Sequence, residues 1–215
     1  IASCLVGSEM CIRDSYYFNP DRNGQLSYGL NVVGDKLYLF GDAGKENAGQ
    51  LVKDTHLNNG DFKLNIDPNG IVTVANNHPA FLQDNGGHWY YMDKDGKLMT
   101  GPQTIDGVKV YFHQNGIQAK GYFVKDEEDN KSRYYDKDTG ALATNQYVIA
   151  YNPYKHRIER YYVNDQGIRL TGPQTIDGKQ VYFDKYEGCQ VFDNFGDDGY
   201  FYDQDGNRVD LGANH

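Results

Sequence analysis

The chain has 215 residues and a formal net charge of −9, and 14% of its residues are aromatic, including 19 tyrosines. Hydrophobic residues make up only 39% of it, and no apolar run approaches the ~20 residues that a membrane-spanning helix needs. We therefore expect no membrane insertion. Disordered chains are poor in aromatic residues, so this composition favours an ordered protein. Its acidity provides no global attraction for phosphate backbones, which excludes nucleic acid as an expected partner and fits a secreted protein.

Residues 1–15 differ from everything that follows. They contain Cys4 and Cys11, two of the three cysteines, and none of the tyrosines. The run SCLVGSEMCIRDS resembles a translated sequencing adapter, and the alternative is an ordinary disordered leader. On either interpretation we expect these residues to take no part in the fold, and on the first the chain is a fragment.

The region of residues 16–80 contains three weak copies of one pattern, in which a run of aromatic or apolar residues precedes a polar turn. The turns read NPDRNG, GDAG and DPNG, and they follow residues 16–18, 35–40 and 62–66. Such a run followed by a glycine-containing turn and a second run predicts a β-hairpin. We interpret this region as degenerate hairpin repeats.

Residues 81–215 repeat the pattern clearly. Thr100–Phe112 reads TGPQTIDGVKVYF, and Thr171–Phe183 reads TGPQTIDGKQVYF. The segments WYYMDKDGKLM and RYYVNDQGIRL directly precede the two blocks. Further aromatic pairs, each followed by a polar turn with glycine, recur along the region. Repeats of this length predict an array in which each hairpin buries an aromatic face against the next. No segment has a sustained helical period, so we predict an all-β, β-solenoid-like array of stacked β-hairpin repeats.

These aromatic pairs, Asp-Gly turns and doubled TGPQTIDG blocks resemble the glucan-binding, cell-wall-binding-type repeats of glucansucrases (glycoside hydrolase family 70). They resemble more distantly the choline-binding repeats of Gram-positive surface proteins and the repeats of clostridial toxins. The resemblance implies a secreted, non-catalytic module that holds α-glucan chains beside a separate catalytic barrel. We see no stretch in this chain that is long enough to encode that barrel. It implies no cofactor and no metal.

A site for a sugar ring needs an aromatic platform and hydrogen-bonding side chains near it. Adjacent aromatics on a strand point to opposite faces, so one of each pair is expected in the core and the other available. We predict that the first tyrosine of each pair is the available one. The candidate sugar-binding residues are Tyr90, Gln103, Lys109 and Tyr111 around the first block, and Tyr161, Gln174, Lys179 and Tyr182 around the second. The alternatives are tyrosines that belong to the core and glutamines that bond only local backbone.

Other functions receive less support from the sequence. Choline needs an aromatic cage in which tryptophan is the best face, and the chain has one tryptophan, Trp89. The DKDG and DQDG segments resemble calcium loops but lack the glutamate that such loops require, so we interpret them as turns. The acidic run Asp126–Asp129 is expected to be a solvated loop, and Cys189 has no evident partner. A toxin or adhesin array for other glycans and a purely structural spacer remain alternatives.

Overall fold

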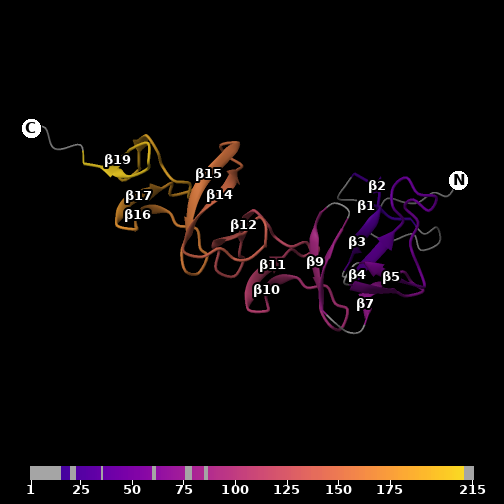
Figure 1. The fold of residues 1–215 in the computed structure, drawn as a ribbon. Coiled ribbons are helices and arrows are strands. Elements are labelled where there is room, and N and C mark those ends of the chain that lie inside the picture. Colours follow the sequence, from indigo (N-terminus) through magenta and orange to yellow (C-terminus); the bar gives the residue numbers. More distant parts are fainter. Residues whose placement is uncertain are drawn as a thin grey trace, which may run out of the picture. The chain divides into compact units, whose positions relative to one another are not determined.

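The structure is a computed structural model that describes residues 16–19, 23–34, 36–59, 62–75, 79–84 and 87–210. The leader predicted over residues 1–15 lies outside the described residues. Contacts divide the chain into two compact units, of which the first falls within residues 1–103 and 112–118 and the second within 104–111 and 119–215. Figure 1 follows the chain from the indigo N-terminal strands to the yellow C-terminal ones.

In the first unit the strands form small antiparallel sheets. The pairs are β1 with β2, β3 with β4, β5 with β6 and β7, and β8 with β9. Their bounds are β1 Phe18–Asn19, β2 Gln25–Leu26, β3 Gly29–Val33, β4 Lys36–Phe40, β5 Thr55–Asn59, β6 Phe62–Ile66, β7 Val72–Val74, β8 Ala80–Gln83 and β9 Trp89–Met92. The three weak copies predicted from the sequence are therefore sheet-forming segments.

The second unit continues the same plan, and its hairpin of β14 and β15 is the longest in the described part of the chain. Strand β12 pairs with β13, β14 with β15, β16 with β17, and β18 with β19 and β20. Their bounds are β12 Tyr122–Lys125, β13 Ser132–Tyr135, β14 Gln146–Asn152, β15 Arg157–Val163, β16 Gly172–Ile176, β17 Lys179–Phe183, β18 Asn194–Phe195, β19 Phe201–Tyr202 and β20 Arg208–Val209. The division between the units falls within the hairpin of β10 (Gly101–Ile105) and β11 (Val108–Phe112).

The described residues contain no α-helix, and the fold is an all-β array of hairpin repeats, as the sequence predicted. Nothing in the described part of the chain is a helix long and apolar enough to cross a membrane.

The two TGPQTIDG blocks form hairpins because Asp-Gly supplies the required turn. Asp106 and Gly107 have φ values of 50° and 81°, and Asp177 and Gly178 have values of 50° and 77°. Positive φ at both central residues is the geometry of the type I′ turn, whose twist matches that of the flanking strands. Each block is thus one complete hairpin rather than the end of one and the start of another.

The polar turn after each aromatic strand behaves differently from the prediction. We expected the run after the turn to return as a second strand. In several repeats the structure shows only a single bridge there, such as Met92 with Leu98 and Val163 with Arg169. Full return strands occur at β6–β7 and β19–β20. The reason lies in the backbone hydrogen bonds that the returning segment makes.

The returning segments bond to the preceding hairpin, and this links successive repeats. The amide of Gln118 donates to the carbonyl of Trp89 at 2.7 Å, and the amide of Gln190 donates to the carbonyl of Arg160 at 2.8 Å. Both glutamine side chains are buried. Because each buried backbone amide needs a partner, these bonds satisfy the turn and stack one repeat on the next.

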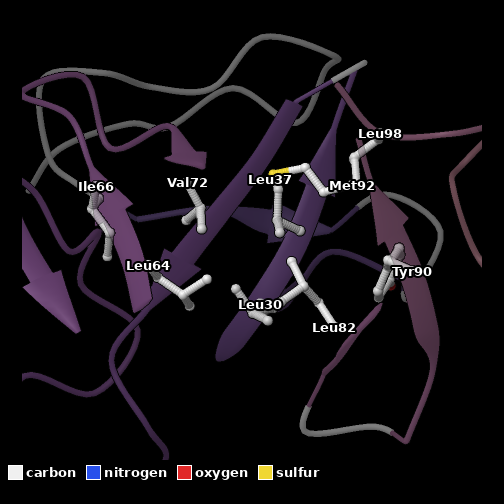
Figure 2. Close-up of a cluster of buried hydrophobic side chains, with 9 residues drawn as sticks. All are labelled: Leu30, Leu37, Leu64, Ile66, Val72, Leu82, Tyr90, Met92 and Leu98. Atoms are coloured by element: carbon white, nitrogen blue, oxygen red, sulfur yellow. The ribbon is translucent and has the colours of Figure 1, made fainter. Parts of the chain in front are cut away.

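A continuous apolar cluster forms the core of the first unit. Leucines from β3, β4, β6 and β8 meet Tyr90 and Met92 of β9 (Figure 2). Met92 and Val72 are completely buried. The hairpins therefore share one core, which an isolated two-stranded hairpin does not have.

The second unit is built around buried tyrosines. The ring of Phe123 contacts those of Tyr134 and Tyr161 edge-on, with centroid separations of 5.3 and 5.0 Å. Val148, Val163 and other apolar residues complete this cluster. Tyrosine thus supplies much of the core of this unit.

Candidate functional site

The first tyrosine of each pair was expected to be available, and the structure places three of these rings in the core. Tyr90, Tyr161 and Tyr182 are 4%, 2% and 4% exposed. On β9 and β15 the alternation itself is as expected, but its faces are reversed, since the second tyrosines, Tyr91 and Tyr162, are half-buried. The register explains this, because Tyr90 and Tyr161 pair with Leu82 and Val148, which also point into the cores.

Two of the predicted tyrosines pack against the aromatic strand of the next repeat. Tyr111 is half-buried, and its ring centroid lies 5.8 Å from that of Tyr135. Tyr182 lies 5.6 Å from Tyr202 in the same way. Phe183, next to Tyr182, is also buried, so β17 is covered on both faces at this point. Stacking by the next repeat overrides the simple alternation that the sequence suggests.

Gln103 and Gln174 occupy equivalent positions in the two blocks and make the same local bond. Gln103 Nε2 donates to the carbonyl of Thr100 at 2.7 Å, and Gln174 Nε2 donates to the carbonyl of Thr171 at 2.9 Å. Both side chains are partly exposed. The local bond fixes the orientation of each carboxamide. The sequence had left this backbone-bonding role open as the alternative.

The two predicted lysines do not occupy equivalent positions. Lys109 is the second residue of β11, whereas Lys179 is the first residue of β17 and pairs with Ile176. Both side chains are exposed. An offset of one residue sends neighbouring strand side chains to opposite faces, so the two lysines cannot play the same part in both copies.

Gln174 lines a hollow that we name the Gln174 hollow. It has a volume of about 210 Å³, and the polar or aromatic residues around it are Gln174, Thr175, Gln180, Asp198, Tyr202 and Arg208. The first three come from hairpin β16–β17, and the last three come from the sheet β18–β20 and the turn within it. Of the eight predicted residues, Gln174 is the one that lines this hollow.

Two of the residues that line the Gln174 hollow, Tyr202 and Asp198, are joined by a hydrogen bond. The Tyr202 hydroxyl donates to Asp198 Oδ2 at 2.7 Å, and the Tyr202 ring is 1% exposed. Burial of the ring, together with this bond to a carboxylate, raises the pKa of Tyr202 above its ordinary value. The hydroxyl therefore remains a donor, and the other oxygen of Asp198, Oδ1, accepts from the amide of Tyr200 at 3.3 Å.

Arg208 brings a positive charge to the same hollow. Its guanidinium carbon lies 3.3 Å from the centroid of the Tyr200 ring, and its Nη2 contacts Asp210 Oδ1 at 3.3 Å. Arg208 Nε is buried and has no hydrogen-bond partner among the residues that the structure describes. A buried donor of this kind gains free energy when a ligand oxygen accepts from it.

Sequence reasoning missed Asp198, Tyr202 and Arg208. The repeat that follows the first block has different residues at the places of Asp198 and Arg208. Asp198 stands four residues before Tyr202, whereas Lys131 stands four residues before Tyr135. Arg208 stands two residues after the turn glycine of its repeat, and Leu142 stands at the equivalent position of the earlier repeat. Tyr202 belongs to a recognised aromatic cluster, but its ring could not be assigned to a hollow without knowing how the repeats stack.

The first unit has a separate hollow of about 180 Å³. Val32, Gly34, Lys97, Leu98 and Thr100 are among the residues that line it, and none of the eight predicted residues does so. Its walls offer few side-chain hydrogen-bonding groups, which makes it a poorer place for a hydroxyl-rich ligand.

The acidic turns use their carboxylates on the backbone. Asp93 Oδ1 accepts from the amides of Asp95 and Lys97 at 2.9 and 2.8 Å, and Asp203 Oδ1 makes the equivalent bonds. These bonds define the Asp-x-x-Gly turns and are the ordinary role of aspartate there. Among the described residues no group of three or more His, Cys, Asp or Glu side chains is placed to hold a metal ion.

Comparison with known protein families finds two repeat families that match part of the chain. A model of the choline-binding repeat matches residues 99–147, and a model of a cell wall binding repeat matches residues 80–98. Residues 80–147 are thus similar to cell-wall-binding and choline-binding repeats. This agrees with the resemblance stated from the TGPQTIDG blocks.

Curated relatives extend the similarity along most of the chain. Glucosyltransferase-S of Streptococcus mutans serotype c is 36% identical over 178 residues, which are 83% of this chain and 11% of the relative. Glucosyltransferase-S of Streptococcus downei is 36% identical over 206 residues, which are 90% of this chain and 14% of the relative. The chain thus spans about an eighth of the length of these relatives.

Solved structures with repeats of this kind are also similar. Choline binding protein F from Streptococcus pneumoniae, in the presence of a peptidoglycan analogue, has a TM-score of 0.49 and 22% identity, covering 91% of this chain and 61% of that chain. Alternansucrase in complex with isomaltononaose has a TM-score of 0.32 and 22% identity, covering 90% of this chain and 17% of that one.

Proposed function

We propose that this chain is a non-catalytic carbohydrate-binding array that holds an α-glucan, and that the Gln174 hollow is one of its binding sites. The observation that carries the proposal is the convergence of hydrogen-bonding side chains from two successive repeats on one hollow. Its volume equals about seven water volumes, which suits one sugar unit of a chain rather than a whole oligosaccharide.

The chemistry of the hollow matches that of a sugar. Pyranose rings have apolar faces and hydroxyl edges, so a site needs a flat surface together with donors and acceptors. Gln174 and Asp198 supply acceptors and Arg208 supplies donors, while the Tyr202 ring is buried and contributes mainly its bond to Asp198. The carboxamide of Gln174 is already oriented by Thr171, so binding costs little side-chain entropy.

The relatives support the choice of α-glucan. Both relatives are named as glucosyltransferases, and this chain matches only a small share of their length. A repeat array attached to such an enzyme would hold the growing product close to it, outside the cell or at the cell wall. Several weak sites on one array would raise the effective concentration of the polymer. Gln103, Lys109 and Tyr111 of the first block and Lys179 of the second are proposed as individual sugar contacts.

Choline is the second candidate, because the family description names it. The Gln174 hollow is poorly suited to it. A quaternary ammonium ion prefers several aromatic faces, whereas Tyr202, the one aromatic residue among the described residues that line this hollow, is buried.

Affinity electrophoresis with soluble dextran in the gel tests the proposal. The wild-type chain should be retarded relative to a gel without dextran, and added choline should not release it. Gln174→Ala removes one oriented hydrogen-bonding group, worth about 1 kcal/mol, so its apparent affinity should fall about fivefold. Gln103→Ala is the matched comparison, because it removes an equivalent local bond to Thr100 and leaves the hollow intact, so its loss of affinity should be smaller.

The outcomes separate the alternatives. No retardation of a folded chain by any α-glucan would contradict the proposal and favour a structural spacer. Release by choline would favour the choline site. Equal loss of affinity in Gln174→Ala and Gln103→Ala would show that the two blocks bind alike, and it would contradict the special role given to the Gln174 hollow.

A further inference from the structure

A lysine and a cysteine meet in the second unit, away from the Gln174 hollow. Lys155 lies in the turn that joins β14 to β15, and Cys189 follows the turn after β17. Lys155 Nζ donates to Cys189 Sγ at 3.0 Å, although 34 positions separate the two residues in the chain. Cys189 is completely buried, and its neighbours are Tyr134, Val148 and other apolar side chains of the core.

A carboxylate completes this cluster. Glu187 Oε2 lies 3.4 Å from Lys155 Nζ and 3.7 Å from Cys189 Sγ. Asn152 Nδ2 donates to the same oxygen at 2.9 Å. An amine, a thiol and a carboxylate that can accept a proton therefore lie in contact.

Both turns that carry the cluster are fixed by their own hydrogen bonds. Asn152 Oδ1 accepts from the amides of Tyr154 and Lys155, and Asp184 Oδ1 accepts from the amide of Glu187 at 2.7 Å. The side chain of Lys155 is 36% exposed, and its contacts with Cys189 and Glu187 hold the amine in place. Pre-organisation of two reacting groups in this way raises their effective concentration greatly.

We propose that Lys155 and Cys189 form a covalent nitrogen–sulfur crosslink when the chain meets a hydroperoxide. In the first step the thiol sulfur attacks the peroxide, an S–O bond forms as the O–O bond breaks, and the thiol proton goes to the leaving oxygen, which gives sulfenic acid and an alcohol, or water when the oxidant is hydrogen peroxide. In the second step Lys155 Nζ, having given a proton to Glu187, attacks the sulfur. The N–S bond forms, the S–O bond breaks, and the hydroxide leaves as water with the remaining amine proton.

The known chemistry of sulfenic acids supports this outcome. A sulfenic acid condenses with a nearby thiol or nitrogen, and the described part of the chain provides no second cysteine. Burial raises the pKa of the Cys189 thiol, while Lys155 acts against this by favouring the thiolate. The amine that favours the first step is thus also the group placed to trap its product.

The crosslink would join the turn of the longest hairpin to the next repeat. A link between distant positions restricts the unfolded chain and so raises the temperature of thermal unfolding. It would act as an oxidation-dependent staple across two stacked repeats. This role is independent of carbohydrate binding at the Gln174 hollow.

The test uses the full chain with Cys4→Ser and Cys11→Ser, so that Cys189 is the remaining cysteine. After treatment with hydrogen peroxide, removal of the peroxide and proteolysis without reductant, mass spectrometry should find one peptide pair joined through Lys155 and Cys189. Its mass should be about 2 Da below the sum of the two peptides, and dithiothreitol should separate them.

Three variants control the experiment. Lys155→Arg keeps the positive charge but removes the reactive amine, and Cys189→Ser removes the sulfur, so both should abolish the linked pair. Lys185→Arg should leave it unchanged, because Lys185 pairs with Asp197 instead. Recovery of Cys189 as free thiol or as unlinked sulfinic acid in the wild-type background would overturn the proposal, as would a link to another lysine.

Discussion

Substitution of one buried tyrosine should change how the stability of the array depends on alkaline pH. Tyr161 is 2% exposed and packs against Phe123 in the core of the second unit. Burial, reinforced by the negative charge on nearby Cys189, raises the pKa of Tyr161 from 10.0 to about 12. An ionised phenol is poorly tolerated in such surroundings, so the folded chain holds the proton more tightly than the unfolded chain does.

The size and sign of the effect follow from linkage. Below pH 10 the phenol is protonated in both states, and the stability that it contributes is fully present. Between pH 10 and about 12 the unfolded chain loses its proton first, and stability falls. A shift of two pKa units corresponds to about 3 kcal/mol, which is lost at about 1.4 kcal/mol per pH unit across this window.

Urea unfolding of wild type and Tyr161→Phe over this pH range measures the effect. The variant should lose stability less steeply by about 1.4 kcal/mol per pH unit, although its stability at pH 8 differs from that of wild type. Tyr154→Phe is the matched control, because that ring is 79% exposed and folding changes its surroundings little. Identical slopes for wild type and Tyr161→Phe would refute the reasoning.

Two further substitutions test the second unit by chemical or thermal unfolding. Tyr202→Phe removes the 2.7 Å bond to Asp198 and should lower the free energy of unfolding by about 2 kcal/mol, whereas no loss would show that the bond is not formed. Gly178→Ala places a side chain at a φ of +77° with open space around it, so it should cost about 1–2 kcal/mol through the backbone alone, and an unchanged melting temperature would contradict the type I′ turn.

The repeats were predictable because their signals are local. Asp-Gly between two runs of strand-forming residues specifies a type I′ hairpin, and the structure has it at both Asp106–Gly107 and Asp177–Gly178. The all-β class followed from the same signals. The location of the return strands was wrong in several repeats, because a returning segment can bond either to its own strand or to the preceding hairpin, and composition does not distinguish these partners.

The faces of the aromatic strands were less predictable than the strands. Alternation indicates that Tyr161 and Tyr162 point in opposite directions, but which face is buried depends on the segments packed on each side. At Tyr182 both faces are covered, because Tyr202 of the next repeat lies over the ring. The Gln174 hollow depends on the same stacking, so Asp198 and Arg208 had no signal of their own in the sequence.

Isothermal titration of the chain with a dextran oligosaccharide, comparing wild type with Arg208→Leu, tests the central claim most directly. Leucine is compatible with the fold, since Leu142 stands at the equivalent place of the earlier repeat. The variant loses the donors that Arg208 brings to the Gln174 hollow, so its affinity should fall about tenfold while its unfolding transition remains cooperative. Equal affinities in the two chains, or no binding of the oligosaccharide by wild type, would contradict the account.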